Sequence, residues 1–380
     1  MSTAKRPLSR RGALLAGTAA LAGGLGLAGR ADAAVRPPWA TRSPLTGLTP
    51  AQRAGQRVIY SYPGLTPPTQ LMDAISGGRA AGVIFFGENI QSLSQIKGVI
   101  QKMNQANASA PVKAPLLLMT DQEGGMVRRL PGEPVLSAKD VGSSSDPRGE
   151  AAYTGTGAGE NLAGVGMNVN LAPVLDVYRT AGDFEDQYER SYSTVPSVVG
   201  TCGSAFVTAQ QNAGVAATAK HFPGLGPASA SQNTDLRAVT LTTSASTLRS
   251  VDEVPYQAAI SAGVKLVMLS WAIYPALDAA RPAGLSPTVV GELRNRLGFR
   301  GVTITDALEA GALANYGGVA ERAVAAAAAG MDLILCSARD SDQGHDAVAA
   351  LRDALAAGTL DGAAFDAGAL RVNALRNSLA

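Results

Sequence analysis

Short runs of apolar residues recur eight times along the chain, at residues 57–62, 82–86, 115–121, 167–173, 215–222, 265–271, 301–306 and 331–337. Such runs are typical of strands that are buried on both faces, as in a parallel sheet. Segments between them, such as 90–106, 286–298 and 319–330, place apolar residues at helical spacing and often end in glycine. Eight strands that alternate with helices predict an α/β fold of the (β/α)8 TIM-type barrel class. A doubly wound open sheet is the alternative that this pattern leaves open.

The first 34 residues follow a different pattern. A basic start, STAKRPLSRRG, precedes a short apolar run and small residues at Ala33 and Ala34, which is typical of an export signal. The adjacent Arg10 and Arg11 indicate the twin-arginine route. A retained membrane anchor is the alternative, although a span needs about 20 apolar residues.

The chain therefore divides into three predicted parts: an export signal at 1–34, a linker or N-terminal strap at 35–48, and a barrel domain at 49–380. We expect a secreted protein with no membrane insertion once the signal is removed. Residues 1–34 hold five of the 32 basic and one of the 30 acidic residues, so the remainder has a formal net charge of −2. That balance favours no nucleic-acid partner, because nucleic-acid binders carry a clustered positive face.

Two cysteines, Cys202 and Cys336, are too few for a disulfide scaffold. The predicted barrel places them after opposite strands, farther apart than a disulfide allows, so we expect two buried free thiols. The sequence has no cluster of Cys and His that would suggest a zinc site, and no metal is expected.

Ionisable residues stand at the ends of several predicted strands: Asp121 with Glu123, Asp176, Lys220 with His221, and Asp306. The active sites of such barrels lie at the carboxyl ends of their strands. Several ionisable groups that converge there from different strands indicate an enzyme.

Three motifs contain these residues. In DQEGGMVRRL (121–130), Asp121 can accept hydrogen bonds from two hydroxyl groups of a ligand, or it can cap the turn that follows. In AKHFPGLG (219–226), Lys220 and His221 can donate hydrogen bonds to hydroxyls or to an amide carbonyl, and a buried structural histidine is the alternative.

The third motif, GFRGVTITDALEAGAL (298–313), ends a strand with Asp306. A carboxylate there must face a pocket or be paired, because burial of an unpaired charge is costly. In a pocket it can attack an anomeric carbon and hold a glycosyl ester. The alternative is that Asp306 caps a helix that begins at Ala307.

In this order, the motifs resemble glycoside hydrolase family 3, in its single-domain β-N-acetylglucosaminidase branch of secreted actinobacterial type, from about Gly55 to the C-terminus. NVNLAPVLDV (168–177) and ERSY (189–192) add to the resemblance. It implies a carbohydrate substrate, an N-acetylglucosaminide, and no cofactor. It also implies residue roles: Asp306 is the nucleophile, Asp176 supports the sugar site, and the terminal sugar is bound by Asp121, Arg190, Lys220 and His221.

The β-glucosidase branch is the alternative within the family. Its members usually carry a second domain, whereas only about 75 residues follow Asp306 here, which favours the single-barrel branch.

One departure from the branch affects the mechanism. Its members commonly carry an Asp-x-His pair in the loop after KHFPG, where the histidine is the general acid/base. Here residues 224–240 contain no histidine, and Asp235 is the one carboxylate. Asp235 is therefore the candidate acid/base; a role in anchoring the loop is the alternative.

We expect a retaining exo-β-N-acetylglucosaminidase that acts on cell-wall or chitin-type oligosaccharides through a glycosyl-aspartate intermediate. A sugar-binding barrel with weak or no catalysis, and transfer of the sugar to phosphate, remain as alternatives.

Overall fold

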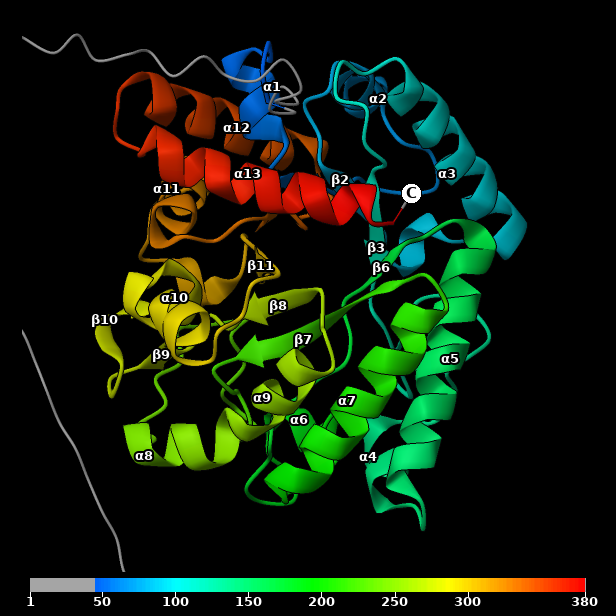
Figure 1. The fold of residues 1–380 in the computed structure, drawn as a ribbon, viewed down its shortest axis with the longest axis vertical. Helices are drawn as coiled ribbons and strands as arrows, with labels where there is room; N and C mark the ends of the chain where they lie inside the picture. The colour runs from blue at the N-terminus through cyan, green and yellow to red at the C-terminus, as the bar shows by residue number, and fades with distance from the viewer. Residues whose placement is uncertain (1–44, 380) are drawn as a thin grey trace, which may run out of the picture. The chain divides into compact units, whose positions relative to one another are not determined.

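Eight parallel strands form the centre of the described chain, residues 45–379 of this computed structural model (Figure 1). The strands are β1 (Val58–Tyr60), β2 (Gly82–Ile84), β3 (Leu117–Thr120), β6 (Val169–Asn170), β7 (Ala216–Phe222), β8 (Leu266–Leu269), β11 (Val302–Thr305) and β12 (Ile334–Leu335). They follow one another in this order around the sheet, and β12 pairs with β1. A parallel bridge from Ile304 to Leu333 joins β11 to β12 and closes the barrel. The predicted TIM-type barrel is confirmed, and the open sheet is wrong.

Each of the eight predicted runs contains one strand, although most strands are shorter than their runs. The 167–173 run shows why, since only Val169–Asn170 is regular strand. Pro173 has no backbone N–H to donate to the sheet, and beyond it only an isolated bridge from Val174 to Lys220 continues the pairing.

Most of the helices lie against the outer face of the barrel. The longer ones are α2 (Thr69–Ser76), α3 (Leu93–Ala108), α5 (Pro147–Val165), α7 (Pro196–Asn212), α9 (Val254–Ser261), α11 (Val319–Ala329), α12 (Ser341–Ala356) and α13 (Gly362–Asn377). The shorter ones are α1 (Pro50–Gly55), α4 (Ala138–Ser143), α6 (Phe184–Gln187), α8 (Ala245–Thr247) and α10 (Pro287–Gly291).

Local chemistry sets the ends of these helices, as α5 illustrates. The side chain of Asp146 accepts a hydrogen bond from the backbone of Gly149, and Pro147 occupies the first helical position, where its missing N–H costs nothing. The helix ends at Gly166, whose φ of 93° is the left-handed conformation that glycine adopts most readily. α5 and α7 then pack side by side along one flank (Figure 1).

Residues along each strand alternate between two apolar layers. One layer fills the barrel interior and includes Ile59, Leu117, Met119 and Ile304. The other packs between the strands and the helices and includes Val58, Tyr60, Leu116 and Leu118. Because side chains in a strand alternate between faces, a residue two positions beyond the last inward apolar residue also faces the interior. Polar residues at the carboxyl ends of the strands can face the barrel interior for the same reason.

Two small antiparallel hairpins lie outside the barrel sheet: β4 (Gln122–Gly124) with β5 (Val127–Arg128), and β9 (Ile273–Tyr274) with β10 (Asp278–Pro282). Cys202, in α7, and Cys336, after β12, are both free and buried, as predicted.

The predicted export signal, and residues 35–44 of the predicted strap, lie outside the described residues, so both stay predictions. Among the helices of residues 45–379, none combines the length and the apolar character that crossing a bilayer requires.

Candidate active site

The strand register brings three predicted residues to the mouth of the barrel. Asp121 lies two positions after Met119, and Asp306 two positions after Ile304, both of which fill the barrel interior. Lys220 lies four positions after Ala216, which also faces inward. All three side chains line one pocket. The alternation of side chains along the strands, which packs the core, therefore also directs these three residues into the pocket.

This pocket at the carboxyl ends of the strands has a volume of about 490 Å³, within the usual range for a small-molecule site. Its apolar lining includes the last inward residues of four strands or their continuations: Ile84, Leu171, Met268 and Leu335. Its charged lining comprises Asp121, Glu123, Arg129, Glu185, Arg190, Lys220, His221, Asp235, Asp306, Glu309 and Arg339.

The inner wall of the pocket is a network of ion pairs between side chains that are at most 16% exposed. Lys220 Nζ lies 2.8 Å from both Asp121 Oδ1 and Glu123 Oε1. Arg190 donates two parallel hydrogen bonds of 2.9 Å to Glu123, and its Nη1 lies 2.9 Å from Glu185 Oε2. A bidentate pair holds a guanidinium group in one orientation and also compensates its charge. The two cations are therefore held rigidly at the pocket wall.

Burial alone would raise the pKa of Glu123, but Arg190 and Lys220 outweigh it and hold that pKa well below its usual range. Burial would lower the pKa of Lys220, but Asp121 and Glu123 reverse the effect and raise it. For Glu185, by contrast, burial dominates and raises the pKa in spite of Arg190 and His221. The network thus keeps Glu123 and Lys220 charged, whereas Glu185 is the carboxyl group most readily protonated among these.

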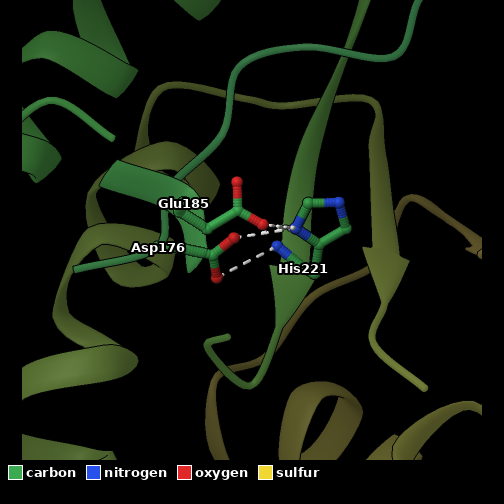
Figure 2. A group of neighbouring side chains, drawn as sticks. All are labelled: Asp176, Glu185 and His221. Atoms are coloured by element: carbon green, nitrogen blue, oxygen red, sulfur yellow. Dashed lines mark hydrogen bonds and ion pairs between the residues drawn. The ribbon is translucent and has the colours of Figure 1, made fainter. Parts of the chain in front are cut away.

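Two carboxyl groups orient His221 (Figure 2). Asp176, which is fully buried, has Oδ2 at 2.7 Å from His221 Nδ1, and its Oδ1 accepts the backbone N–H of Leu225 at 2.6 Å. Glu185 Oε1 lies 3.8 Å from the same ring nitrogen. Burial would lower the pKa of His221, but Asp176 and then Glu185 and Asp306 outweigh it and raise that pKa. The arrangement favours an imidazolium that can donate a hydrogen bond into the pocket through Nε2.

The same three residues are a candidate donor set for a metal ion, because their ligand atoms all lie within 4.8 Å of one another. His221 Nδ1 is, however, already bonded to Asp176, and Glu185 faces the guanidinium of Arg190. These contacts compensate the carboxylate charges without an ion. We therefore interpret the group as a histidine positioned by carboxylates.

Asp306 faces the pocket from the end of β11. Its Oδ1 accepts the backbone N–H of Ala307 at 2.7 Å, but no helix begins there, since the next helical turn is η5 (Gly311–Leu313). The interpretation of Asp306 as a helix cap is therefore wrong. Burial raises the pKa of Asp306, and the positive charge of His221 opposes that effect, while the negative charge of Asp235 adds to it.

The loop that carries Asp235 is pinned through its backbone. The carbonyl of Asp235 accepts the N–H of Gly311 at 2.8 Å, and the carbonyl of Thr234 accepts that of Ala312 at 3.0 Å. The carboxylate of Asp235 is exposed, lines the pocket, and forms no hydrogen bond or ion pair with any residue between 45 and 379. The side chain is thus not what anchors the loop.

The structure gathers every predicted site residue in one place. Asp121, Arg190, Lys220, His221, Asp235 and Asp306 line the pocket, and Asp176 stands directly behind His221. Sequence reasoning missed Glu185, Glu309, Arg129 and Arg339, which also line it. They lie in loops and in the four-residue helix α6, where no periodic pattern reveals which way a side chain points. The one sequence signal for Arg129 is its place within the first motif.

Comparison with known proteins identifies the family. Residues 61–375 match the pattern of the "Glycosyl hydrolase family 3 N terminal domain". The chain belongs to glycosyl hydrolase family 3.

Among relatives of this family 3 chain, an uncharacterized secreted glycosyl hydrolase of Arthroderma benhamiae is 45% identical over 340 residues, which are 89% of this chain and 96% of the relative. A family 3 β-N-acetylglucosaminidase structure from Paenibacillus is 33% identical, with a TM-score of 0.82 over 87% of this chain. The chain spans only 63% of that protein. A β-N-acetylhexosaminidase structure from Beutenbergia cavernae is 32% identical, with a TM-score of 0.78 over 87% of this chain and 98% of its own. The chain is thus a glycoside hydrolase by family.

Proposed function

We propose that the protein is a retaining exo-β-N-acetylglucosaminidase with Asp306 as nucleophile. The observation that carries the proposal is the position of the Asp306 carboxylate, which faces the same pocket as the ion-paired wall of Asp121, Arg190 and Lys220. Hydroxyls of a terminal sugar can bind along that wall, since Asp121 accepts hydrogen bonds and His221 donates them. The preference for an N-acetylated sugar is carried over from the named activities of the Paenibacillus and Beutenbergia structures.

Two displacements make up the proposed reaction. In the first, Asp306 attacks the anomeric carbon, a carbon–oxygen ester bond forms, and the glycosidic bond breaks as its oxygen receives a proton. In the second, water attacks the same carbon, loses a proton, and releases the sugar and the Asp306 carboxylate. The positive charge of His221 favours the ionised form that attack requires.

The general acid/base of this reaction is, in our proposal, Asp235. Its carboxylate lines the pocket, its charge acts on Asp306, and it has no hydrogen-bond or ion-pair partner among residues 45–379. A group free of partners on a backbone-pinned loop can donate its proton in the first step and accept one in the second. The retaining mechanism needs one such group beside the nucleophile.

A direct assay tests the function. The purified protein should release phenol from an aryl β-N-acetylglucosaminide far faster than from the matching β-glucoside. No release from either glycoside would favour the non-catalytic sugar-binding barrel, and preference for the glucoside would favour the β-glucosidase branch. Adding phosphate to the same assay tests for transfer, because a glycosyl phosphate would replace the free sugar as product.

We further propose that the protein is exported by the twin-arginine route, as residues 1–34 predict; the Arthroderma relative is also named as secreted. Replacement of Arg10 and Arg11 together by lysine should leave the precursor inside the cell. Unchanged export of the double variant would contradict this route.

A further inference from the structure

Without Glu185, the ion pairs of the inner wall would form two separate groups. The first, around the guanidinium, consists of Asp121, Glu123, Arg190 and Lys220. The second consists of His221 and Asp176. Among residues 45–379, Glu185 alone forms ion pairs with members of both groups. Its Oε2 lies 2.9 Å from Arg190 Nη1, and its Oε1 lies 3.8 Å from His221 Nδ1.

A tight turn at the end of α6 brings Arg190 back to Glu185. The backbone N–H of Arg190 donates to the carbonyl of Glu185 at 3.0 Å, and that of Glu189 donates to the carbonyl of Asp186 at 2.9 Å. These two bonds are the pattern of a Schellman motif, in which Glu189 takes the left-handed position with a φ of 56°. That conformation is costly for a residue with a side chain and concentrates at functional sites. The backbone thus accepts local strain where it places the cation beside the carboxyl group.

The carboxyl group of Glu185 is held by its ion pairs. Its side chain is 0% exposed, and neither oxygen accepts a hydrogen bond from the part of the chain that the structure describes. Figure 2 shows Glu185 and Asp176 directed at the same ring nitrogen of His221, Nδ1, so that Nε2 points away from both carboxyl groups. An unpaired carboxylate at this depth would be costly, so the two cations are what offset its burial.

Several elements surround Glu185 with ionisable groups. These groups are Glu123 of β4, Asp176 after β6, His221 of β7, Tyr256 of α9 and, after α6 itself, Arg190. Once His221 is protonated, the inner wall holds three cations and four carboxyl groups. Glu185 is the carboxyl group whose pKa burial raises in spite of its cations. It is therefore the member of the wall best able to change charge.

We propose that Glu185 is a positioning residue that joins the two groups into one unit, so that Arg190 and His221 hold their positions and charges together. Its consequence for sugar binding rests on the proposed function, in which both cations bind the terminal sugar. When Glu185 loses its charge, each cation keeps only the partners of its own group. A single carboxyl group then controls both cations at once.

Nuclear magnetic resonance can read the charge of His221 directly, because the whole chain contains only one other histidine, His345. In full-length protein without a histidine tag, isotopically labelled at its histidine nitrogens, the signal that persists in His345→Gln belongs to His221. Glu185→Gln should move the titration midpoint of that signal to lower pH, because the imidazolium loses a nearby negative charge. An unmoved midpoint would overturn the proposal.

Two further variants make this reading specific. Glu189→Gln is the same chemical change on the same segment, at an exposed side chain outside the pocket lining, and should leave the midpoint of His221 in place. Glu185→Asp withdraws the charge by one methylene and should cause a smaller shift in the same direction as Glu185→Gln. It carries the test if Glu185→Gln does not fold, and an unmoved midpoint in it then overturns the proposal.

A double-variant cycle tests the link itself. Arg190 opposes the rise in the pKa of Glu185, so Arg190→Gln should let Glu185 take up a proton and thereby lower the pKa of His221. In the Glu185→Gln background this route is absent, and Arg190→Gln should not lower the midpoint further. Equal lowering in both backgrounds would show that Arg190 acts on His221 without Glu185, which contradicts the link.

A binding measurement relates the link to the sugar. With Asp306→Asn as background, calorimetry should show that Glu185→Gln weakens the binding of N-acetylglucosamine about tenfold at neutral pH. The difference should shrink at acidic pH, where Glu185 itself is protonated and His221 is charged in both proteins. An equal loss at both pH values would mark Glu185 as a structural residue only. A wild type that neither binds nor cleaves N-acetylglucosaminides would contradict the proposed function, yet the shift of the His221 midpoint would still support the link.

Discussion

The two sides of the pocket are built by opposite means. On the inner wall, Lys220 and His221 are buried and Arg190 is half-buried, and each is held by two carboxyl groups. Elsewhere along the pocket, Asp235 and Glu309 are exposed, and neither carboxylate forms an ion pair with any residue of the described chain. The groups that we propose to bind the terminal sugar are thus held in ion pairs, whereas Asp235 and Glu309 are not.

This difference suggests a division of labour. Side chains held rigidly by ion pairs suit the binding of a terminal sugar, because rigid partners lose little entropy on binding. A group that donates and then accepts a proton must change its charge within each cycle, which ion pairing would oppose.

Asp306→Asn should have the largest effect, because the carboxamide keeps the shape of the side chain and removes the attacking anion. Turnover of any glycoside should fall by at least about 10⁴-fold, with the melting temperature unchanged within a few degrees. Rates on an aryl N-acetylglucosaminide and a thermal melt measure this. Near-normal turnover would show that the nucleophile lies elsewhere.

Asp235→Ala should come next, and its effect should depend on the leaving group. A sugar leaving group needs a proton, whereas dinitrophenolate hardly does, so cleavage of a disaccharide should slow by about 10²–10⁴-fold and that of a dinitrophenyl glycoside far less. Azide should partly restore the second step by replacing activated water. Equal losses on both substrates, without azide rescue, would assign the proton to another donor.

Asp176→Asn should act through His221. Without the carboxylate the pKa of His221 falls, and since the imidazolium is lost as pH rises through that pKa, the alkaline limit of kcat/KM should move to lower pH. At neutral pH we expect a loss of about 10²-fold, as for other broken buried pairs. Asp146→Asn is the control: it keeps the cap of α5 and should leave the pH profile unchanged.

Gly311→Ala should produce the smallest effect. It tests the position of the loop while leaving the Asp235 carboxylate in place. A Cβ on Gly311 would stand 2.4 Å from the backbone of Leu236, so the loop beside Asp235 must shift. We expect an approximately tenfold loss on a disaccharide, because small displacements of a proton donor are costly. Gly362→Ala meets no atom within 4 Å and, like Gly311, has no positive φ, so it is the matched control without a steric clash. Unchanged disaccharide cleavage by Gly311→Ala would argue that the loop position is unimportant.

The fold could be read from the sequence because each barrel strand is a continuous apolar run. The site residues at strand ends, such as Asp121 and Asp306, followed from the same runs, since the register that buries Met119 and Ile304 also aims the residue two positions on. The sequence could not predict which residues of loops and short helices line the pocket. Glu185 enters the pocket from α6, and a helix of four residues is too short to leave a periodic trace in the sequence.

Burial of the inner charges also has a consequence for the medium in which the protein works. Ions in solution screen exposed charges over about 8 Å at 0.15 M salt, but they act much less on pairs removed from water. Lys220, which contacts Asp121 and Glu123, is only 2% exposed. Binding of a terminal sugar along this wall should therefore vary little from dilute to saline surroundings, which would suit the export that we propose for this protein.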